Sequence, residues 1–330
     1  MLGLIQRVFI WYTAAMPTHN TLVILTRDQK EFEADIRNLD LPDLEIIAPK
    51  NDAEIEESIG RATILLANPF LAASWLDQTT QLQWIQSTFA GVDALNAEQL
   101  RKDYLLTNVK EVYGEAITEY VFGYILYFFK ELGENRAAQQ RCEWTQRPYE
   151  TLQGKVLSIL GAGSIGKEIA RAGKAFGMKT LGYRQSDKLV EHFDEIHTGN
   201  GLHDVLSQGD YIVNVLPNTK ETTHIINNKT LSLMKSSSIF MNVGRGTAVD
   251  EEALIYALNE GGIAKAVLDV FQHEPLPADS PLWKTKNVYI TPHVSGYILT
   301  KKVTQIFADN YKRFQAGEEL RYQVDLTKGY

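Results

Sequence analysis

Three charged residues, Arg245, Glu274 and His293, each lie just after a short apolar segment of the chain. A guanidinium binds a carboxylate through paired hydrogen bonds, which fixes the orientation of the bound group. A histidine titrates near neutral pH, and an adjacent carboxylate stabilises its protonated form and so raises its pKa. If the three side chains meet, they can hold a small anionic substrate and exchange a proton with it at neutral pH.

Each of these residues also has a structural interpretation. Arg245 precedes a helix expected to begin near Asp250, where a cation opposes the helix dipole, so a ligand-binding role is favoured over a stabilising one. Glu274 by itself could be a solvated loop carboxylate, and His293 could be a hydrogen-bonded histidine at the end of a strand. Their occurrence together favours catalysis.

A nucleotide site is predicted by the stretch VLSILGAGSIG, in which an apolar run leads directly into Gly161, Gly163 and Gly166. The first glycine permits a tight turn, the second lets a pyrophosphate approach the backbone, and the third lets the following helix lie close to the strand. The N–H groups at the start of that helix then face the phosphates. A glycine turn without a ligand is the alternative, but the helical pattern that follows and a second strand at 180–183 favour a dinucleotide.

A dinucleotide and the three charged side chains together meet the requirements of one reaction. Reduction of a 2-keto acid by a nicotinamide needs a cation to hold the substrate carboxylate, and a proton for the oxygen that becomes negative as hydride arrives. Arg245 would supply the cation, and His293, paired with Glu274, the proton. The sequence therefore predicts an oxidoreductase that acts on a small 2-keto or 2-hydroxy acid.

The elements that must position these residues alternate between apolar and amphipathic segments, which is typical of parallel βαβ units. The expected strands are TLVILTR, LEIIAP, ATILLAN, LQWIQS and LLTNV in the first half, and the run before the glycines, 180–183, 211–216, 238–243, 266–270 and 288–291 in the second. Ligands bind outside the carboxyl ends of such strands, where the charged residues lie. One long helix is expected from Gly114 to about Arg141, and another over 301–316.

Size and composition limit the class of protein. The 330 residues are enough for two domains, and a net charge of −8 without a basic run gives no reason to bind nucleic acid. Cys142 is the only cysteine, which excludes an intrachain disulfide and fits a cytoplasmic protein.

The apolar stretch 120–129 is too short to span a membrane and is interpreted as a buried helix. Residues 1–15 are expected to be an unstructured leader, with a signal peptide as the alternative.

One cluster of residues could suggest a metal, because His192 and His197 have Asp194 and Glu195 between them. The four residues lack the tight spacing of metal ligands. We therefore interpret them as a solvated loop and expect no metal.

Several blocks of the sequence resemble those of a known family. The residues NVGRG at 242–246, LDVFQHEPLP at 268–277 and TPH at 291–293 resemble the signature blocks of the D-isomer-specific 2-hydroxyacid dehydrogenase family. The segments LQWIQSTFAGVD and VLPNTKET are similar to further blocks. The resemblance covers nearly the whole chain from about Thr21, and within the family it is strongest to glyoxylate and hydroxypyruvate reductases.

The resemblance implies roles for the charged residues and for two backbone positions. His293 would be the acid and base of the reaction, Glu274 its partner, and Arg245 the cation that orients the substrate. The backbone N–H groups near Ala90 and Gly91 would receive the substrate carboxylate.

The resemblance also implies a fold and a cofactor site. It implies an α/β protein of two doubly wound parallel-sheet domains. A Rossmann NAD(P)-binding domain, 113–298, is inserted in a flavodoxin-like substrate domain, 16–112 plus 299–330. The C-terminal helix then packs on the N-terminal half, and family members are commonly homodimers. Besides the three glycines, the implied cofactor contacts are Ser164, Ile165, Arg184, Ser186, Leu216, Pro217, Thr222, Val243, Gly244 and, near the nicotinamide carboxamide, Asp269.

One position departs from the pattern of NAD-preferring members. Those members carry an acidic residue at the end of the second strand, where it bonds the ribose hydroxyls, whereas this chain has Arg184, followed by Gln185 and Ser186. A guanidinium and a hydroxyl attract a 2′-phosphate that a carboxylate would repel. We therefore expect NADP to be preferred over NAD, with a purely surface role for Arg184 as the alternative.

These features predict reduction of small 2-keto acids to D-2-hydroxy acids with His293 as the proton donor. A formate- or phosphite-type dehydrogenase on the same fold is one alternative, and Glu274 argues against formate oxidation, which needs no carboxylate-assisted acid. A nucleotide-sensing corepressor or scaffold without turnover is another, and the complete set with Arg245 argues against it. The sequence leaves the side chain of the substrate open.

Overall fold

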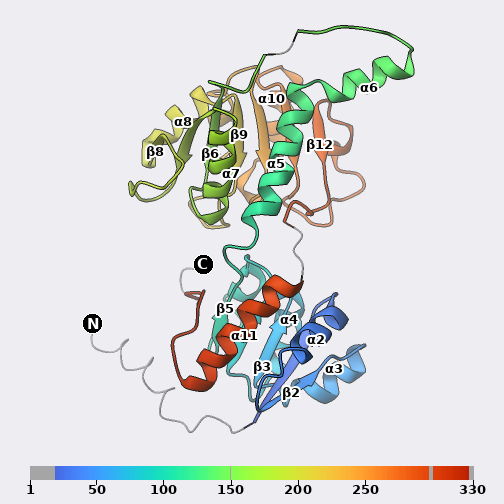
Figure 1. Ribbon diagram of the computed structural model, residues 1–330, viewed down its shortest axis with the longest axis vertical. Coiled ribbons are helices and arrows are strands. Elements are labelled where there is room, and N and C mark those ends of the chain that lie inside the picture. The colour runs from blue at the N-terminus through green and yellow to red at the C-terminus, as the bar shows by residue number, and fades with distance from the viewer. Residues whose placement is uncertain (1–18, 149, 297–299, 327–330) are drawn as a thin grey trace. The chain divides into compact units, whose positions relative to one another are not determined.

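The computed structural model describes residues 19–148, 150–296 and 300–326. The chain divides into two compact units, a first unit formed by Met1–Val112 and Ile298–Tyr330 and a second unit formed by Tyr113–Tyr297. The second unit is thus inserted in the sequence of the first, and Figure 1 shows blue N-terminal and red C-terminal segments in the same unit. The expected leader, residues 1–15, lies outside the described residues.

The first unit is built on five parallel strands in the order β2-β1-β3-β4-β5. The strands are β1 (Asn20–Leu25), β2 (Leu44–Ile47), β3 (Ile64–Ala67), β4 (Trp84–Ser87) and β5 (Leu105–Thr107). Its first helices are α2 (Gln29–Arg37), α3 (Asp52–Ile59) and α4 (Pro69–Trp75). This is the strand order of flavodoxin-like sheets.

Helices cover both faces of this sheet, which explains why β1, β3 and β4 are buried throughout and why β1 and β3 are rich in Val, Ile and Leu. α3 and α4 contribute to an apolar cluster on one face. On the other face, α2 packs with α11 (Thr300–Ala316), which comes from the far end of the chain. Phe307 of α11 stacks on Trp84 with ring centroids 5.3 Å apart. A buried hydrogen bond of 3.1 Å joins Gln86 to Asn310, 224 positions away.

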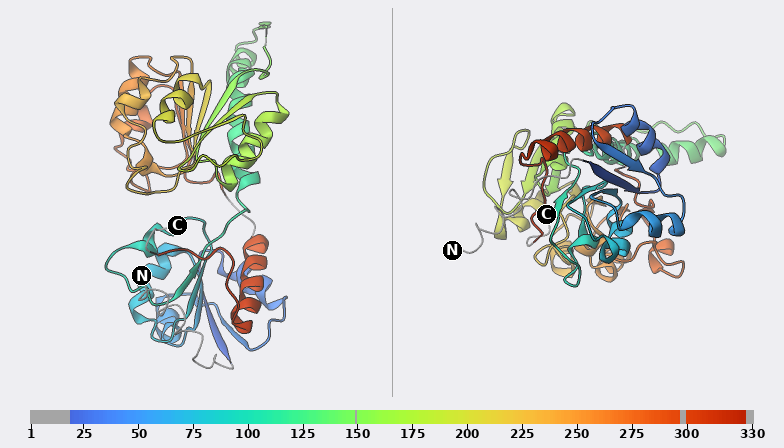
Figure 2. Two further views of the ribbon diagram at one scale, coloured as in Figure 1. Left: turned by 90° about the vertical axis from the view of Figure 1, so that its left-hand side faces the viewer. Right: turned by 90° about the horizontal axis from the view of Figure 1, so that it is seen from below.

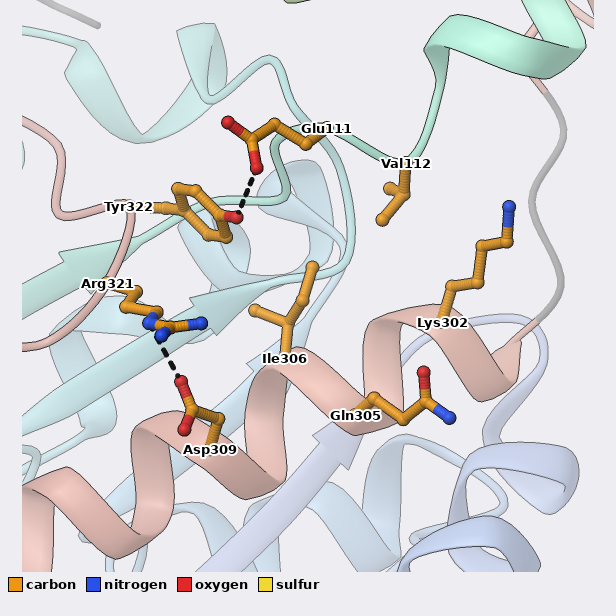
Figure 3. A pocket seen from close by; sticks show the side chains of 8 residues that line it. All are labelled: Glu111, Val112, Lys302, Gln305, Ile306, Asp309, Arg321 and Tyr322. Atoms are coloured by element: carbon orange, nitrogen blue, oxygen red, sulfur yellow. Dashed lines mark hydrogen bonds and ion pairs between the residues drawn. The ribbon is translucent and has the colours of Figure 1, made fainter.

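The segment after α11 folds back onto β5 and adds an antiparallel bridge to it. Figure 3 shows two of the contacts made by this segment. The hydroxyl of Tyr322 donates to the carboxylate of Glu111 at 2.9 Å, and Arg321 pairs with Asp309 of α11 at 3.2 Å. The C-terminal segment therefore belongs to the first unit through both backbone and side-chain contacts.

The second unit is built on seven parallel strands in the order β12-β11-β10-β9-β6-β7-β8. The strands are β6 (Val156–Leu160), β7 (Lys179–Tyr183), β8 (Glu195–His197), β9 (Tyr211–Asn214), β10 (Ile239–Asn242), β11 (Lys265–Leu268) and β12 (Val288–Ile290). The order reverses between β6 and β9, which is the switch point where doubly wound sheets bind ligands. The predicted fold class, two parallel-sheet α/β domains, is confirmed.

Helices cover both faces of the second sheet as well, which Figure 2 shows edge-on in its left view. α5 (Gly114–Phe129) and α7 (Ser164–Ala175) pack together on one face. On the other face, α8 (Leu202–Gln208), α9 (Asn228–Leu231) and α10 (Glu251–Asn259) bury an apolar cluster with the strands. Side chains point in opposite directions along β6, so Leu157 lies under α7 and Leu160 belongs to the opposite cluster.

The single helix expected from Gly114 to about Arg141 is wrong, because the structure has two helices there. α5 ends at Phe129, and α6 (Leu132–Gln140) begins after Glu131, whose φ of 49° is left-handed and interrupts the helix. α5 is apolar and packs on α7, whereas α6 is polar and mostly exposed. No helix in the described part of the chain is both long and apolar enough to cross a membrane.

The solvated loop expected around His192 and His197 is wrong in part, because only residues 191–194 of this stretch lie outside strands and helices. Residues 195–197 form β8, the edge strand of the second sheet. Before it, Asp194 accepts a hydrogen bond of 2.8 Å from the backbone N–H of Thr180. Among the described residues, no group of three or more His, Cys, Asp or Glu side chains is placed to hold a metal ion.

Candidate active site

Most of the residues singled out by the sequence lie at one edge of the second sheet. Because its strands are all parallel, the segments that follow them emerge at the same edge. That edge carries the glycine loop after β6, Arg184 after β7, Leu216 and Pro217 after β9, Arg245 after β10, Asp269 and Glu274 after β11, and His293 after β12.

The glycine loop has the geometry of a phosphate site. Gly161 leaves β6 with a φ of 110°, and a Cβ on Gly166 would overlap the carbonyl oxygen of Gly161, so the turn closes tightly only with glycine at both positions. A Cβ on Gly163 would meet nothing within 4 Å, so this side of the loop is open. α7 begins at Ser164 without a side-chain cap or an acidic residue in its first turn. The N–H groups of Ser164 and Ile165 are therefore suited to bind an anion.

Two asparagines that the sequence analysis missed connect the loops after β9 and β10. Asn214 and Asn242 are the last residues of their strands, and both are fully buried. Asn214 Nδ2 donates to Asn242 Oδ1 at 2.9 Å, and Asn242 Nδ2 donates to the carbonyl oxygen of Arg245 at 3.0 Å. Asn214 Oδ1 accepts the N–H of Leu216 at 3.3 Å. An asparagine at the final position of two neighbouring apolar strands is the sequence signal that could have revealed this pair.

Arg245 lies in an extended conformation, with φ −137° and ψ 140°, and its Nη1 donates to the carbonyl oxygen of Gly244 at 2.8 Å. The next residue, Gly246, approaches the loop after β11 so closely that a Cβ would overlap the backbone of Phe271. Asp250 caps α10, as expected of the residue where this helix begins. The contact between the two loops places Arg245 beside the segment that carries Glu274.

The expected acid and its partner are in contact. His293 Nδ1 lies 2.7 Å from Glu274 Oε2, and Glu274 Oε1 accepts the N–H of Phe271 at 3.0 Å. His293 has a left-handed φ of 54°. The side chains are 48% exposed for His293 and 36% for Glu274, so the pair is accessible to a substrate. Because Glu274 occupies Nδ1, Nε2 is the nitrogen that can face the substrate.

The contact changes the pKa of both groups. The hydrogen bond with Glu274 raises the pKa of His293, against burial and the positive charge of Arg245, which act to lower it. Partial burial acts to raise the pKa of Glu274, but hydrogen bonds from His293 and from the N–H of Phe271 outweigh it and lower the pKa. The pair therefore favours a protonated imidazole beside an ionised carboxylate.

Asp269 is a fully buried carboxylate. Its Oδ1 accepts hydrogen bonds from Thr291 Oγ1 at 2.6 Å and from the N–H of Val294 at 2.9 Å, and its Oδ2 accepts the N–H of Ser295 at 2.9 Å. Its carbonyl oxygen accepts the N–H of His293 at 2.9 Å. Asp269 thus organises the segment that carries His293, and its contact with the nicotinamide stays a prediction.

The remaining cofactor candidates lie on neighbouring loops. Arg184 is half-buried directly after β7, and no ion pair in the described part of the chain uses its guanidinium. Ser186, two residues later, is exposed. Thr222 Oγ1 donates to the carbonyl oxygen of Pro217 at 2.6 Å and so closes the loop after β9. Close approach of this loop to the loop after β10 brings together Leu216, Val243 and Gly244.

The two backbone positions implied for the substrate carboxylate, Ala90 and Gly91, lie in the first unit after β4. Ser87 shapes this segment, because its hydroxyl both accepts the N–H of Phe89 at 2.9 Å and donates to the Phe89 carbonyl at 2.8 Å. Asn108 Nδ2 donates to the carbonyl oxygen of Ala90 at 2.8 Å. Within the described residues, no acceptor receives the N–H of Ala90 or Gly91, so both can donate to an anion.

Comparison with known proteins gives the family. Residues 122–295 match the family model described as D-isomer specific 2-hydroxyacid dehydrogenase, NAD binding domain. A glyoxylate/hydroxypyruvate reductase A from Escherichia fergusonii is 31% identical over 248 residues, which are 73% of this chain and 80% of that protein.

Solved structures are similar along nearly the whole chain. A D-isomer specific 2-hydroxyacid dehydrogenase family protein from Aeromonas salmonicida is 43% identical with a TM-score of 0.90, over 93% of this chain and 99% of that one. An NADPH-dependent glyoxylate/hydroxypyruvate reductase from Sinorhizobium meliloti, in complex with NADP and sulfate, is 25% identical with a TM-score of 0.86, over 94% and 100%. A D-isomer specific 2-hydroxyacid dehydrogenase from Xanthobacter autotrophicus, in complex with NADPH and MES, is 27% identical with a TM-score of 0.85, over 94% and 100%.

A glycine loop at the switch point of a parallel sheet, with a histidine–carboxylate pair on the same edge, defines a dinucleotide-dependent oxidoreductase. The chain belongs to the D-isomer specific 2-hydroxyacid dehydrogenase family. The resemblance inferred from the sequence blocks is therefore confirmed.

Proposed function

We propose that this protein is an NADPH-dependent reductase of small 2-keto acids, of the glyoxylate and hydroxypyruvate type, that forms D-2-hydroxy acids. The observation that carries the proposal is the 2.7 Å contact of His293 with Glu274 on the sheet edge that also holds the glycine loop. Bound NADPH would supply the hydride, and the residues of this chain bind and orient the substrate and supply the proton.

Arg245 is the proposed cation for the substrate. Its charge acts on both Glu274 and His293, which supports a position next to the acid. A guanidinium can donate to the carbonyl oxygen and the carboxylate of a 2-keto acid together, which orients the carbonyl and stabilises the developing negative charge. The N–H groups of Ala90 and Gly91 are the proposed donors to the carboxylate from the first unit.

His293 is the proposed acid and base. In reduction, its protonated Nε2 donates to the carbonyl oxygen, while Glu274 holds Nδ1 and stabilises the imidazolium before the transfer. In oxidation, the neutral imidazole accepts the proton of the hydroxyl group. A positioned acid of this kind contributes roughly 10²- to 10⁴-fold to the rate.

The second unit is the proposed cofactor domain and the first unit the proposed substrate domain. The open side of Gly163 and the uncapped start of α7 fit a pyrophosphate. Arg184 and Ser186 are the proposed partners of the 2′-phosphate of NADPH. Structures of two relatives contain NADPH or NADP, which supports this cofactor preference.

We also propose that the protein is a cytoplasmic homodimer without a nucleic-acid or membrane partner. Trp144 is 90% exposed and Leu132 is 49% exposed, and both belong to α6 and the segment that follows it. Large apolar side chains that project this far are suited to burial against a second copy of the chain. The charge of −8 supports the absence of a nucleic-acid partner, and the single cysteine supports the cytoplasmic location.

A substrate panel tests the proposed activity. Purified protein is mixed with NADPH or NADH and with glyoxylate, hydroxypyruvate, pyruvate or bulkier 2-keto acids, and oxidation of the cofactor is followed. We expect turnover of the small acids, with greater efficiency for NADPH. Oxidation of formate or phosphite in place of keto-acid reduction would favour a dehydrogenase of that type. Tight NADPH binding without any turnover would instead favour a nucleotide-sensing corepressor or scaffold.

A further inference from the structure

The hydroxyl groups of Tyr120 and Thr291 form a hydrogen-bonded chain that ends at Asp269. The proposed reaction assigns no role to these two hydroxyl groups. The hydroxyl of Tyr120, on α5, lies 2.6 Å from Thr291 Oγ1, which in turn lies 2.6 Å from Asp269 Oδ1. Thr291 Oγ1 donates to Asp269 Oδ1, and this bond uses the single hydroxyl hydrogen of Thr291. Tyr120 must therefore donate to Thr291, which gives the chain one direction.

The end of this chain is the carboxylate that shapes the catalytic segment. Asp269 receives the N–H groups of Val294 and Ser295 on its two side-chain oxygens, and its carbonyl receives the N–H of His293. These bonds hold His293 at a φ of 54°, a backbone conformation that a side chain disfavours. Asp269 therefore holds the backbone from which the imidazole of His293 projects.

We propose that Tyr120 is a positioning residue for the reaction, which acts through Thr291 and Asp269 to hold the imidazole of His293 in its productive orientation. The inference rests on the proposed function, because it assigns His293 the acid role. Within the part of the chain that the structure describes, Tyr120 makes no hydrogen bond to His293 or Glu274. The ring of Tyr120 packs on Tyr124, with centroids 5.1 Å apart, and this contact survives removal of the oxygen. Removal of the Tyr120 hydroxyl therefore tests its hydrogen bonds, which join it to Thr291 and to the side chain of Tyr124.

The variant Tyr120→Phe tests the inference, and Tyr127→Phe, on the same helix but outside the chain of hydroxyls, is the matched control. We expect Tyr120→Phe to lower kcat for keto-acid reduction by about 2- to 12-fold, the effect of one hydrogen bond. The KM for NADPH and the thermal midpoint should stay unchanged, and the solvent deuterium isotope effect on kcat should rise because proton delivery becomes slower. Tyr127→Phe should match the wild type in all four measurements.

A second comparison separates positioning from simple packing. Thr291→Val removes the middle hydroxyl, and the double variant Tyr120→Phe/Thr291→Val should fall no further than Thr291→Val alone, because the two side chains act in one chain. Additive losses, or a kcat for Tyr120→Phe equal to that of Tyr127→Phe, would overturn the inference.

A measurement in the free protein keeps the inference independent of turnover. The imidazole signals of ¹⁵N-labelled histidine report the Nδ1 hydrogen bond of His293, with His293→Gln to assign them. We expect a single sharp His293 signal in the wild type and a broadened or shifted one in Tyr120→Phe. An unchanged signal contradicts the role of Tyr120, whereas a wild-type protein that reduces no 2-keto acid contradicts the proposed function.

Discussion

The 2.7 Å contact between His293 and Glu274 joins a proton donor to the group that tunes it. Loss of the imidazole and loss of the carboxylate therefore have different consequences for the reaction. Removal of the imidazole removes the donor, whereas removal of the carboxylate leaves the donor in place and changes the pH range in which it is protonated.

We expect His293→Gln to lower kcat by about 10²- to 10⁴-fold, because glutamine cannot donate an acidic proton. The dissociation constant of NADPH, measured by fluorescence titration, should change little, since the glycine loop and Arg184 are untouched. His273→Gln, at an exposed histidine of the loop after β11, is the control and should keep wild-type activity. A fully active His293→Gln enzyme would remove this residue from the mechanism.

Glu274→Gln should shift the pH dependence of the reaction. The carboxylate raises the pKa of His293, so in the wild type the protonated imidazole that reduction requires persists to higher pH. Without the negative charge this pKa falls, so the loss of reductase activity with rising pH should begin at lower pH. The rise of the oxidation rate with pH should also move to lower pH, because oxidation requires the neutral imidazole.

Rate profiles of kcat against pH in both directions measure this shift. Glu252→Gln, which removes the same charge in the first turn of α10, is the control and should leave both profiles in place. Coincident profiles for Glu274→Gln and the wild type would mean that the carboxylate does not tune the acid.

Arg184→Asp should reverse the cofactor preference. A hydrogen bond between charged groups is worth enough to change the NADPH-to-NADH ratio of kcat/KM by about 10- to 100-fold, and the new carboxylate repels the 2′-phosphate. Arg171→Asp, on the exposed side of α7, makes the same charge change away from the ribose and should keep the ratio. If both variants keep the wild-type ratio, Arg184 is a surface residue.

The three charged residues could be predicted because each follows an apolar strand at the edge where ligands bind. The buried pair of Asn214 and Asn242 escaped prediction, since the direction of a side chain at a strand end depends on loops from other strands. The inward direction of the Asp269 carboxylate escaped for the same reason. Spacing along the chain shows which residues share an edge, and packing decides which of them the ligand meets.

In the glycine loop, two positions should respond differently to the same added methyl group. Gly163→Ala should lower NADPH affinity by about tenfold or more, because the Cβ occupies the space of the pyrophosphate, with little change in thermal midpoint. Gly166→Ala should lower the midpoint of the free protein, because its Cβ overlaps the carbonyl oxygen of Gly161. Calorimetry and fluorescence titration measure both effects. Equal midpoints for the two variants would contradict this account of the loop.

The buried strands of both sheets could be predicted because helices cover them on two sides and their apolar runs are continuous. β8 was not predicted because it has no apolar run. It is an edge strand with a single neighbour, and Ile196 is its one apolar residue. The break between α5 and α6 had no local signal, since Lys130, Glu131 and Leu132 are all good helix formers. It follows from packing, because α5 is held against α7 and α6 is not.

For the molecule as a whole, the proposed homodimer predicts a mass in solution twice that of one chain. Multi-angle light scattering after size-exclusion chromatography measures it. Trp144→Ser should increase the monomer fraction on dilution, because burial of a tryptophan contributes strongly to an interface. Trp283→Ser, at another exposed tryptophan of the second unit, is the control. A wild-type monomer at all concentrations would refute the dimer.

The presence of two α/β units could be predicted from chain length and from the alternation of segments. Apolar periodicity could not assign α11 to the first unit, because nothing in the pattern of 300–316 identifies its partner. The assignment came from the resemblance, and the stacking of Phe307 on Trp84 accounts for it physically.

The insertion of one unit within the other also sets an order for biosynthesis. The hydrogen bond between Gln86 and Asn310 joins residues 224 positions apart, so the face of the first sheet that α2 shares with α11 is only partly covered while the ribosome makes the rest of the chain. At about 5 to 20 residues per second, this interval lasts roughly 10 to 45 seconds. The inserted unit emerges complete within that time, so the nascent protein should finish folding from the middle outward, with its earliest strands among the last to be closed.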